Sequence, residues 1–351
     1  MKSKNVLIIT DYAAPYEGNF IMSLKKLEKS IIEDGGEFYY FFQQEAKNIN
    51  WVNKMNNYHF FGKNILNNIK IFNNFIKRNN IDIVYSHFCL PKTQLAIKIS
   101  RIMNKNIKLV QHFHNHYELP NNIVKKIIFR FIFKGDINIG CSKDVADSIP
   151  YAKKRVTYVT NAIDFSRLDI YENIKLTDNK FVILMFGYTY ERKGVDLAIK
   201  AIQKLNNSNI LLAISVSKNL EEFKQCIIRD FVKVPNFVKI LEPRNDIATY
   251  YKACNLFLSA AREEGFCYAI VEAVYCGKPC ICTKLPGQPN EIPDLLTVES
   301  ENIEEIAKKI QLVVEEKNKL STSKVKKYVS DTYGIDTWVK EIKKVIINEE
   351  K

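Results

Sequence analysis

The feature that most constrains the fold is a regular alternation of short apolar runs, rich in β-branched and aromatic residues, with longer helical stretches. This alternation runs from end to end and predicts α/β layering, with parallel sheets covered by helices. The polar stretch 169–180 divides the expected strands into two series. They are residues 5–10, 37–42, 82–88, 108–113, 137–142 and 156–160, and then 181–187, 209–216, 238–241, 256–260 and 279–283.

The length of 351 residues fits two domains rather than one core. We therefore expect two doubly wound, Rossmann-like domains that face each other across a cleft. In such sheets ligands bind beyond the carboxyl ends of the strands, so that a cleft can hold a donor on one side and an acceptor on the other.

The eight cysteines lie mostly in apolar runs and lack the paired C-x2-C spacing of a zinc site. We read them as small buried side chains in a reducing compartment. The first apolar run, 5–10, is too short for a signal peptide, and nowhere do about 18 apolar residues follow one another. The expectation is a cytoplasmic chain without a membrane span.

The net charge of +13 is concentrated in one region, since residues 51–134 hold 14 Lys or Arg against two acidic residues. Segments 65–78 and 123–134 mix Ile and Phe with Lys and Arg at nearly helical spacing. This pattern suits a face that lies on an anionic membrane. A solvated face on ordinary helices is an equal alternative. Nucleic acid is not expected, because no recognised binding module accompanies the charge.

Two carboxylates, Glu264 and Glu272, frame an apolar run that contains no other charge. The surrounding residues predict a strand, a turn and a helix that ends near Cys276. If both carboxylates were helical they would lie about 12 Å apart, which suits the two ends of one elongated ligand. Gly265 would direct N–H groups of the helix start at a phosphate. The pattern indicates a nucleotide sugar, against the alternative of exposed acids on a surface helix.

A loop with two adjacent cations, Arg192 and Lys193, follows the strand expected at 181–187. Cations fixed beside a departing nucleoside diphosphate stabilise the negative charge that develops on it. A solvated turn is the alternative for this loop.

Four motifs occur in order: Asn161-Ala-Ile-Asp164, Gly187 with Arg192-Lys193-Gly194-Val-Asp196, Glu264-Gly-Phe266 with Glu272-Ala273, and Cys276-Gly-Lys-Pro279. Together they resemble the family 4 retaining glycosyltransferases of the GT-B fold, from about residue 156 to 292. The resemblance implies that residues 1–162 are the acceptor side, with a C-terminal helix (335–351) packed back on it and anchored by Trp338. Residues 163–334 would bind the nucleotide-sugar donor.

The resemblance also implies the roles of the residues on the donor side. Glu272 would bind the ribose hydroxyls, Glu264 hydroxyls of the transferred sugar, and Lys193 the diphosphate. Tyr188 stands where the family usually has an arginine, so that either Arg192 substitutes for it or the diphosphate is held more weakly. The remaining donor-binding candidates are Gly187, Gly194, Gly265, Phe266 and Cys267.

All five histidines lie between His59 and His116, and three follow one expected strand. The resemblance makes His114 the first choice for a residue near the donor sugar and phosphate, and His112 the second. His87 ends another strand and either lines the cleft or is a satisfied buried histidine. Alternatively His112, His114 and His116 would share one face of a strand and chelate a metal, although no further ligands accompany them.

The loop after the first strand contains Gly18 and Asn19, where the family has a glycine-rich acceptor loop. An ordinary helix-entry turn would explain them equally well. No G-x-G-x-x-G occurs, so that a nicotinamide site is unsupported. No D-x-D occurs either, and we therefore expect no cofactor and metal-independent transfer.

The sequence thus predicts a retaining hexosyltransferase that uses a nucleotide-diphosphate sugar. Its acceptor would be a saccharide or a lipid-linked molecule, in the assembly of a bacterial surface polysaccharide or glycolipid. The enzyme would be cytoplasmic and would bind peripherally to the inner face of the cell membrane. Two alternatives stay open: a nucleotide-sugar epimerase of similar fold, and a catalytically silent partner subunit.

Overall fold

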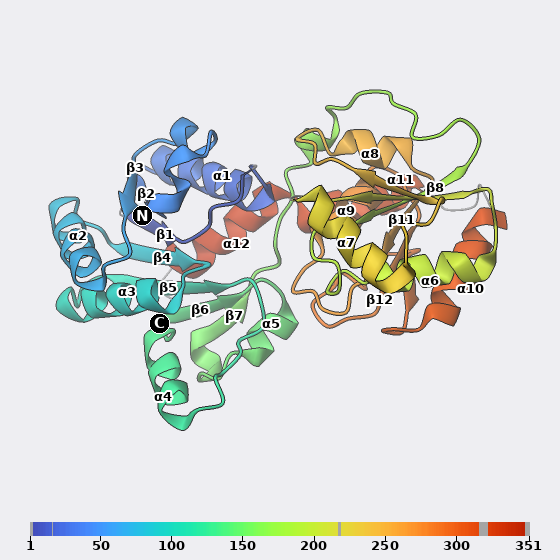
Figure 1. Cartoon of the computed structure of the whole chain (residues 1–351). Helices are drawn as coiled ribbons and strands as arrows, with labels where there is room; N and C mark the ends of the chain where they lie inside the picture. The colour runs from blue at the N-terminus through green and yellow to red at the C-terminus, as the bar shows by residue number, and fades with distance from the viewer. Residues whose placement is uncertain (1–2, 16, 217–218, 316–321, 348–351) are drawn as a thin grey trace. The chain divides into compact units, whose positions relative to one another are not determined.

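The structure is a computed structural model that describes residues 3–347 except 16, 217–218 and 316–321 (Figure 1). The chain divides into two compact units. Unit 1 consists of residues 1–162 and 335–351, and unit 2 of residues 163–334. These limits coincide with the residue ranges expected for the two domains. No helix among the described residues has the length and apolar character needed to cross a membrane.

Unit 1 contains a seven-stranded parallel sheet in the order β3-β2-β1-β4-β5-β6-β7. Its strands are β1 (Val6–Thr10), β2 (Phe38–Gln43), β3 (Tyr58–Phe61), β4 (Ile83–His87), β5 (Lys108–Phe113), β6 (Ile137–Gly140) and β7 (Val156–Tyr158). Its helices are α1 (Asn19–Glu33), α2 (Ile65–Arg78), α3 (Pro91–Met103), α4 (Ile123–Ile132), α5 (Lys143–Ser148) and α12 (Ile335–Ile347).

Successive side chains of the unit 1 strands point to opposite faces of the sheet, and both faces are buried. In β1, Val6 and Ile8 belong to a core shared with α1 and α12, whereas Leu7 and Ile9 belong to a core shared with α2 and α3. Helix α12 lies beside α1 although the whole chain separates them (Figure 1). Trp338 of α12 is buried in the first of these cores.

Unit 2 contains a six-stranded parallel sheet in the order β10-β9-β8-β11-β12-β13. Its strands are β8 (Phe181–Phe186), β9 (Ile210–Ser215), β10 (Val238–Leu241), β11 (Leu256–Ser259), β12 (Cys280–Thr283) and β13 (Leu296–Val298). Its helices are α6 (Val195–Leu205), α7 (Leu220–Phe231), α8 (Ala248–Ala253), α9 (Tyr268–Tyr275), α10 (Ile303–Glu315) and α11 (Thr322–Tyr333).

The predicted class of two doubly wound parallel-sheet units is confirmed. Every strand expected from the sequence is present, but β3 and β13 were not expected. Both are edge strands of four and three residues. An edge strand pairs on one side only, and such short runs give little signal against the surrounding polar sequence.

Candidate active site

The sheet order of unit 2 places a topological switch point at β8 and β11, two neighbouring strands whose connections leave in opposite directions. Ligands of doubly wound sheets bind beyond the carboxyl ends of the strands at such a point. The loop 187–194 leads from β8 to α6, and the loop 260–267 leads from β11 to α9. The predicted donor residues of both loops therefore leave the sheet at the same edge.

Lys193 and Glu264, one from each loop, form a buried ion pair. Only 6% of Lys193 and 8% of Glu264 is exposed. Burial, the largest single effect, lowers the pKa of Lys193, but the charge of Glu264 and smaller effects of its neighbours together raise this pKa, so that the ammonium is protonated at neutral pH. An ammonium has three N–H donors and a carboxylate two acceptor oxygens, so this pair retains hydrogen-bonding capacity for a ligand on both sides.

The backbones of the two loops touch at Gly194 and Arg192. The amide of Arg262 donates to the carbonyl oxygen of Arg192 at 2.9 Å. Gly194 has a φ of +64°, and a Cβ at this position would lie 1.9 Å from the carbonyl oxygen of Ala260. A larger residue would therefore push the loops apart, and the close approach explains the glycine of this motif.

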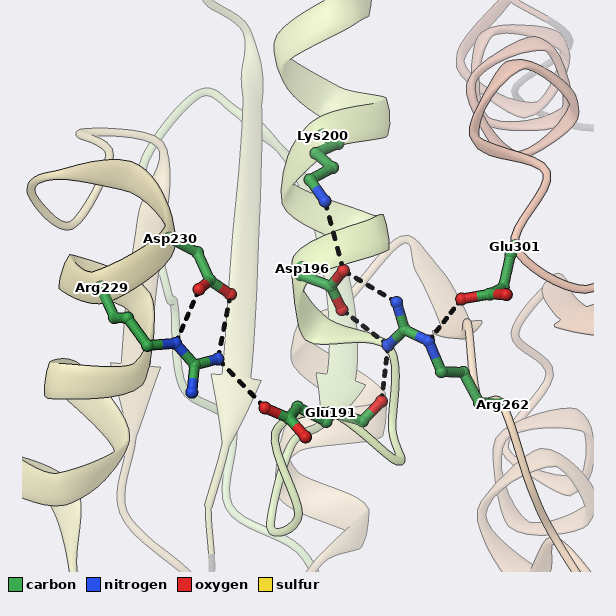
Figure 2. Close-up of polar contacts among 7 residues, drawn as sticks. All are labelled: Glu191, Asp196, Lys200, Arg229, Asp230, Arg262 and Glu301. Atoms are coloured by element: carbon green, nitrogen blue, oxygen red, sulfur yellow. Dashed lines mark hydrogen bonds and ion pairs between the residues drawn. The ribbon is translucent and has the colours of Figure 1, made fainter.

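A network of charged side chains lies beside these loops (Figure 2). The guanidinium of Arg262 donates to both carboxylate oxygens of Asp196, at 2.8 and 2.9 Å, and to the backbone carbonyl of Glu191, at 2.6 Å. Burial, the largest single effect, raises the pKa of Asp196, but the hydrogen bonds and charges of Arg262 and Lys200 together lower it. Arg262 thus ties the loop after β11 to the first turn of α6 and to the loop that carries Lys193.

Glu272 lies in α9 with its side chain buried. The hydroxyl of Tyr251 donates to Oε2 of Glu272 at 2.9 Å, and a guanidinium nitrogen of Arg167 lies 3.9 Å from Oε1. The predicted end of this helix, near Cys276, is confirmed. The predicted order of strand, turn and helix is confirmed, and Glu264 lies in the loop before the helix, because α9 begins only at Tyr268.

The other predicted donor residues lie in the two loops that carry Lys193 and Glu264. Gly187 directly follows β8, and a Cβ there would lie 2.7 Å from the side chain of Ile214. The ring of Tyr188 lies 4.7 Å from Nζ of Lys193, so that it faces the cation where the family has an arginine. Arg192 is half-buried; Gly265, Phe266 and Cys267 are buried directly before α9.

In unit 1, the carboxyl ends of β4 and β5 bring three histidines together. His87 lies opposite His112 in the sheet register, and Nδ1 of His87 lies 3.1 Å from Nε2 of His114. Nδ1 of His112 is hydrogen-bonded to the hydroxyl of Tyr85 at 2.6 Å. Burial lowers the pKa of His114 to about 3 and the pKa values of His87 and His112 well below their usual range. All three imidazoles are therefore neutral near pH 7.

The alternative that His112, His114 and His116 share one face of a strand is wrong. Strand β5 ends at Phe113, so that the strict alternation of side chains stops there. His116 instead pairs with Asp144, at the start of α5.

Gly18 and Asn19 stand at the start of α1. Gly18 is the N-cap residue with a φ of −95°, and its carbonyl oxygen accepts from the amides of Ile21 and Met22. Asn19 is buried. This geometry is that of a helix-entry turn, and it assigns neither residue to a ligand.

The structure adds four residues to the donor side that the sequence did not predict as site residues: Arg167, Asp196, Tyr251 and Arg262. Asp196 is the last residue of the motif that contains Lys193, and Arg262 lies two positions before Glu264. Nothing else in the sequence indicated that these two residues belong to the site. Arg167 and Tyr251 are distant from Glu272 in sequence and reach it only in the folded unit.

Residues 167–329, nearly all of unit 2, match the model of the family described as glycosyl transferases group 1. This match lies on the donor-side unit and supports glycosyltransferase activity for the chain. The family resemblance stated from the sequence motifs is confirmed.

Curated relatives of this glycosyltransferase are distant in sequence. An uncharacterized glycosyltransferase of Methanocaldococcus jannaschii is 22% identical over 291 residues, which cover 80% of this chain and 79% of the relative. The gpi3 subunit of the phosphatidylinositol N-acetylglucosaminyltransferase of Schizosaccharomyces pombe is 24% identical over 246 residues, 65% of this chain. The match covers 52% of that relative, so the chain spans about half its length.

Solved structures resemble the glycosyltransferase over its whole length. A glycosyltransferase from Rickettsia africae has a TM-score of 0.81 at 19% identity and covers 100% of both chains. HepE from Anabaena in complex with UDP-glucose has a TM-score of 0.77 at 18% identity and covers 97% of this chain and 99% of that one. At these identities the structures show a shared fold.

Proposed function

We propose that this glycosyltransferase moves a sugar from a nucleoside-diphosphate sugar to an acceptor hydroxyl, with retention of the anomeric configuration and without a metal ion. The observation that carries the proposal is the buried pair of Lys193 and Glu264 at the carboxyl edge of β8 and β11. It presents a permanent cation and a carboxylate side by side where doubly wound sheets bind nucleotides.

Glu272 would bind the two ribose hydroxyls. A carboxylate accepts hydrogen bonds from vicinal hydroxyl groups. Tyr251 already donates to one oxygen of this carboxylate and so fixes its orientation in α9. The carboxylate of Glu264 would accept hydrogen bonds from hydroxyls of the sugar, next to the phosphate bound by its partner Lys193.

Transfer would break the bond between the anomeric carbon and the β-phosphate oxygen and form a bond from that carbon to the acceptor oxygen on the same face. The acceptor proton passes to an oxygen of the departing diphosphate. Lys193, with Arg192 in the next position, would stabilise the charge that develops on this leaving group. A cation held in place by Glu264 needs little reorganisation during the reaction.

The histidines at the carboxyl edge of unit 1 would serve the sugar and acceptor side. Since the imidazole of His114 is neutral, it would exchange hydrogen bonds with a sugar hydroxyl or phosphate oxygen rather than supply charge. The acceptor side would also include four further residues, namely His87, His112, Gly18 and Asn19.

A UDP-sugar is the first donor to test, because HepE, of similar fold, is described in complex with UDP-glucose. The S. pombe relative is named for transfer of N-acetylglucosamine, which makes UDP-N-acetylglucosamine the second.

Helix α4 is the part of unit 1 that would contact a membrane. Five of its ten residues are exposed large apolar side chains: Ile123, Val124, Ile127, Ile128 and Phe131. Three cations, Lys125, Lys126 and Arg130, alternate with them. Such a helix lies in the interface of an anionic bilayer, with its apolar side chains among the lipids. We therefore propose peripheral binding at the cytoplasmic membrane face and a lipid-linked or otherwise membrane-bound acceptor.

The direct test is release of nucleoside diphosphate from UDP-glucose and UDP-N-acetylglucosamine, with and without candidate acceptors, followed by NMR of the product anomer. Acceptor-dependent release with a retained anomer supports the proposal. Interconversion of nucleotide sugars without acceptor would favour the epimerase, an inverted product would refute retention, and no turnover despite donor binding would favour the silent subunit.

A further inference from the structure

Three imidazoles converge in unit 1 from two neighbouring strands. His87 ends β4, His112 lies opposite it in β5, and His114 follows two residues later. Each offers a ring nitrogen, and the three nitrogens lie within 4.8 Å of one another. In the described part of the chain, these three histidines are close enough together to bind one metal ion.

Two nitrogens of the group lack a hydrogen-bond partner. Nε2 of His87 and Nε2 of His112 are both buried, and neither is paired within the described part of the chain. Buried polar atoms are nearly always satisfied, so two such atoms in one cluster require an explanation. A bound ion that accepts their lone pairs would supply one.

The surroundings fix the rings in a form that can bind a metal. The neutral imidazole is the form that has a free lone pair for a metal ion. When Nδ1–H of His112 donates to the hydroxyl oxygen of Tyr85, 2.6 Å away, this bond orients the ring and leaves the lone pair of Nε2 for the ion. Phe88 stacks on His114 with ring centroids 4.0 Å apart.

We propose that His87, His112 and His114 form a three-histidine site for a borderline transition-metal ion of the Zn²⁺ or Co²⁺ type. Zinc binds imidazole nitrogen at about 2.0–2.1 Å in tetrahedral geometry, and three protein ligands with one open position are a common set. Tetrahedral ligands at this distance are about 3.4 Å apart, and one ring nitrogen from each of the three histidines lies within 4.8 Å of the other two. Small rotations of the rings would complete the site. The absence of oxygen ligands disfavours Mg²⁺ and Ca²⁺.

The ion would also affect catalysis, a consequence that rests on the proposed function. Because the ion takes the lone pair of His114, that ring can no longer accept a hydrogen bond from donor or acceptor. Transfer itself needs no metal in this account, and Zn²⁺ at saturating concentration would inhibit it. His114 is partly buried whereas His87 and His112 are fully buried, so the ion would enter past the ring of His114.

The test is a titration of the purified full-length chain, treated with EDTA and desalted, with Co²⁺. We expect the intense visible bands of four-coordinate Co²⁺ at one equivalent, and their loss when Zn²⁺ is added. The bands should disappear in His114→Gln and in His112→Gln. They should persist in His116→Gln, a matched control whose ring pairs with Asp144 outside the cluster. Circular dichroism establishes that each variant is folded.

Absence of the bands in the folded native protein, or bands that survive in His114→Gln, would overturn the site. Loss of the bands in His116→Gln would place the ion elsewhere and also overturn it. The spectrum requires no activity, so a failure of the proposed function leaves this test intact. If Co²⁺ binds but saturating Zn²⁺ leaves transfer unchanged in an active preparation, the inhibitory consequence is refuted and the site stands.

Discussion

Arg262 and Asp196 form a bidentate ion pair, with both carboxylate oxygens within 2.9 Å of guanidinium nitrogens. The same guanidinium donates to the backbone carbonyl of Glu191 (Figure 2). The amide of Arg262 donates to the backbone carbonyl of Arg192. One residue therefore joins the loop that carries Glu264 to the loop that carries Lys193. The proposed site depends on this junction because its two charged groups come from different loops.

We predict that Arg262→Lys lowers the free energy of unfolding by about 1–3 kcal/mol, since an ammonium cannot reproduce the bidentate bond. Displacement of the two loops should lower kcat by roughly 10- to 100-fold. Chemical denaturation and steady-state kinetics measure the two effects. The control is Arg229→Lys, whose exposed ion pairs with Asp230 and with the side chain of Glu191 are drawn in the same view and should be dispensable. Equal kinetics in both variants would refute the positioning role.

The Asp196 pair should also make stability depend on pH. Arg262 holds the pKa of Asp196 below its unfolded value, so the carboxylate stabilises the native state above pH about 4. This contribution is lost as the pH falls through the lower, native pKa. We expect the native protein to be more stable than Asp196→Asn at pH 7, and the difference to shrink below pH about 4. A difference that is constant from pH 7 to pH 3 would contradict the assignment.

Breaking the buried pair should be more costly than removing it. Lys193→Met leaves the charge of Glu264 buried without its cation, and we expect a loss of about 3–5 kcal/mol in unfolding free energy. The double variant Lys193→Met/Glu264→Leu should recover much of that stability, because no unpaired charge remains. Transfer should be lost in both. Recovery of turnover together with stability in the double variant would show that the pair is structural and has no catalytic role.

Helix α4 should determine membrane binding. Replacing Ile127 and Phe131 by Asn should weaken binding to phosphatidylglycerol vesicles by roughly 10-fold or more, given about 1.5–3 kcal/mol for each buried apolar side chain. High salt should weaken binding further. Vesicle cosedimentation provides the measurement, with phosphatidylcholine vesicles as the uncharged reference. Leu66→Asn, at an exposed position of α2, is the control; an effect at Leu66 and none at α4 would assign binding to the other basic segment.

The fold could be predicted from the sequence because buried parallel strands are continuous apolar runs, as in Phe181–Phe186. The motifs, each a few consecutive residues, could be recognised for the same reason: their signal is local. Contacts between segments that are distant in the sequence could not be predicted in this way. The pair of Lys193 and Glu264 spans 71 positions, and no pattern in either loop indicates that the two charges meet.

The histidine cluster shows the same limit. The spacing of His112, His114 and His116 suggested one face, but the end of β5 at Phe113 removes His116 from it. His87 takes its place because parallel pairing sets it opposite His112. Register between strands is a tertiary property, decided by packing of both sheet faces, and the spacing within one segment does not contain it.

The central claim is that unit 2 binds a nucleotide sugar through Glu272, Glu264 and Lys193, and calorimetric titration with UDP-glucose and UDP-N-acetylglucosamine in the presence of EDTA tests it most directly. We predict binding to the native protein and a loss of at least about 10-fold in affinity for Glu272→Ala, as removal of a hydrogen-bonded charged group costs about 1.5–3 kcal/mol. Binding of the same donor with unchanged affinity to a folded Glu272→Ala variant would contradict the account.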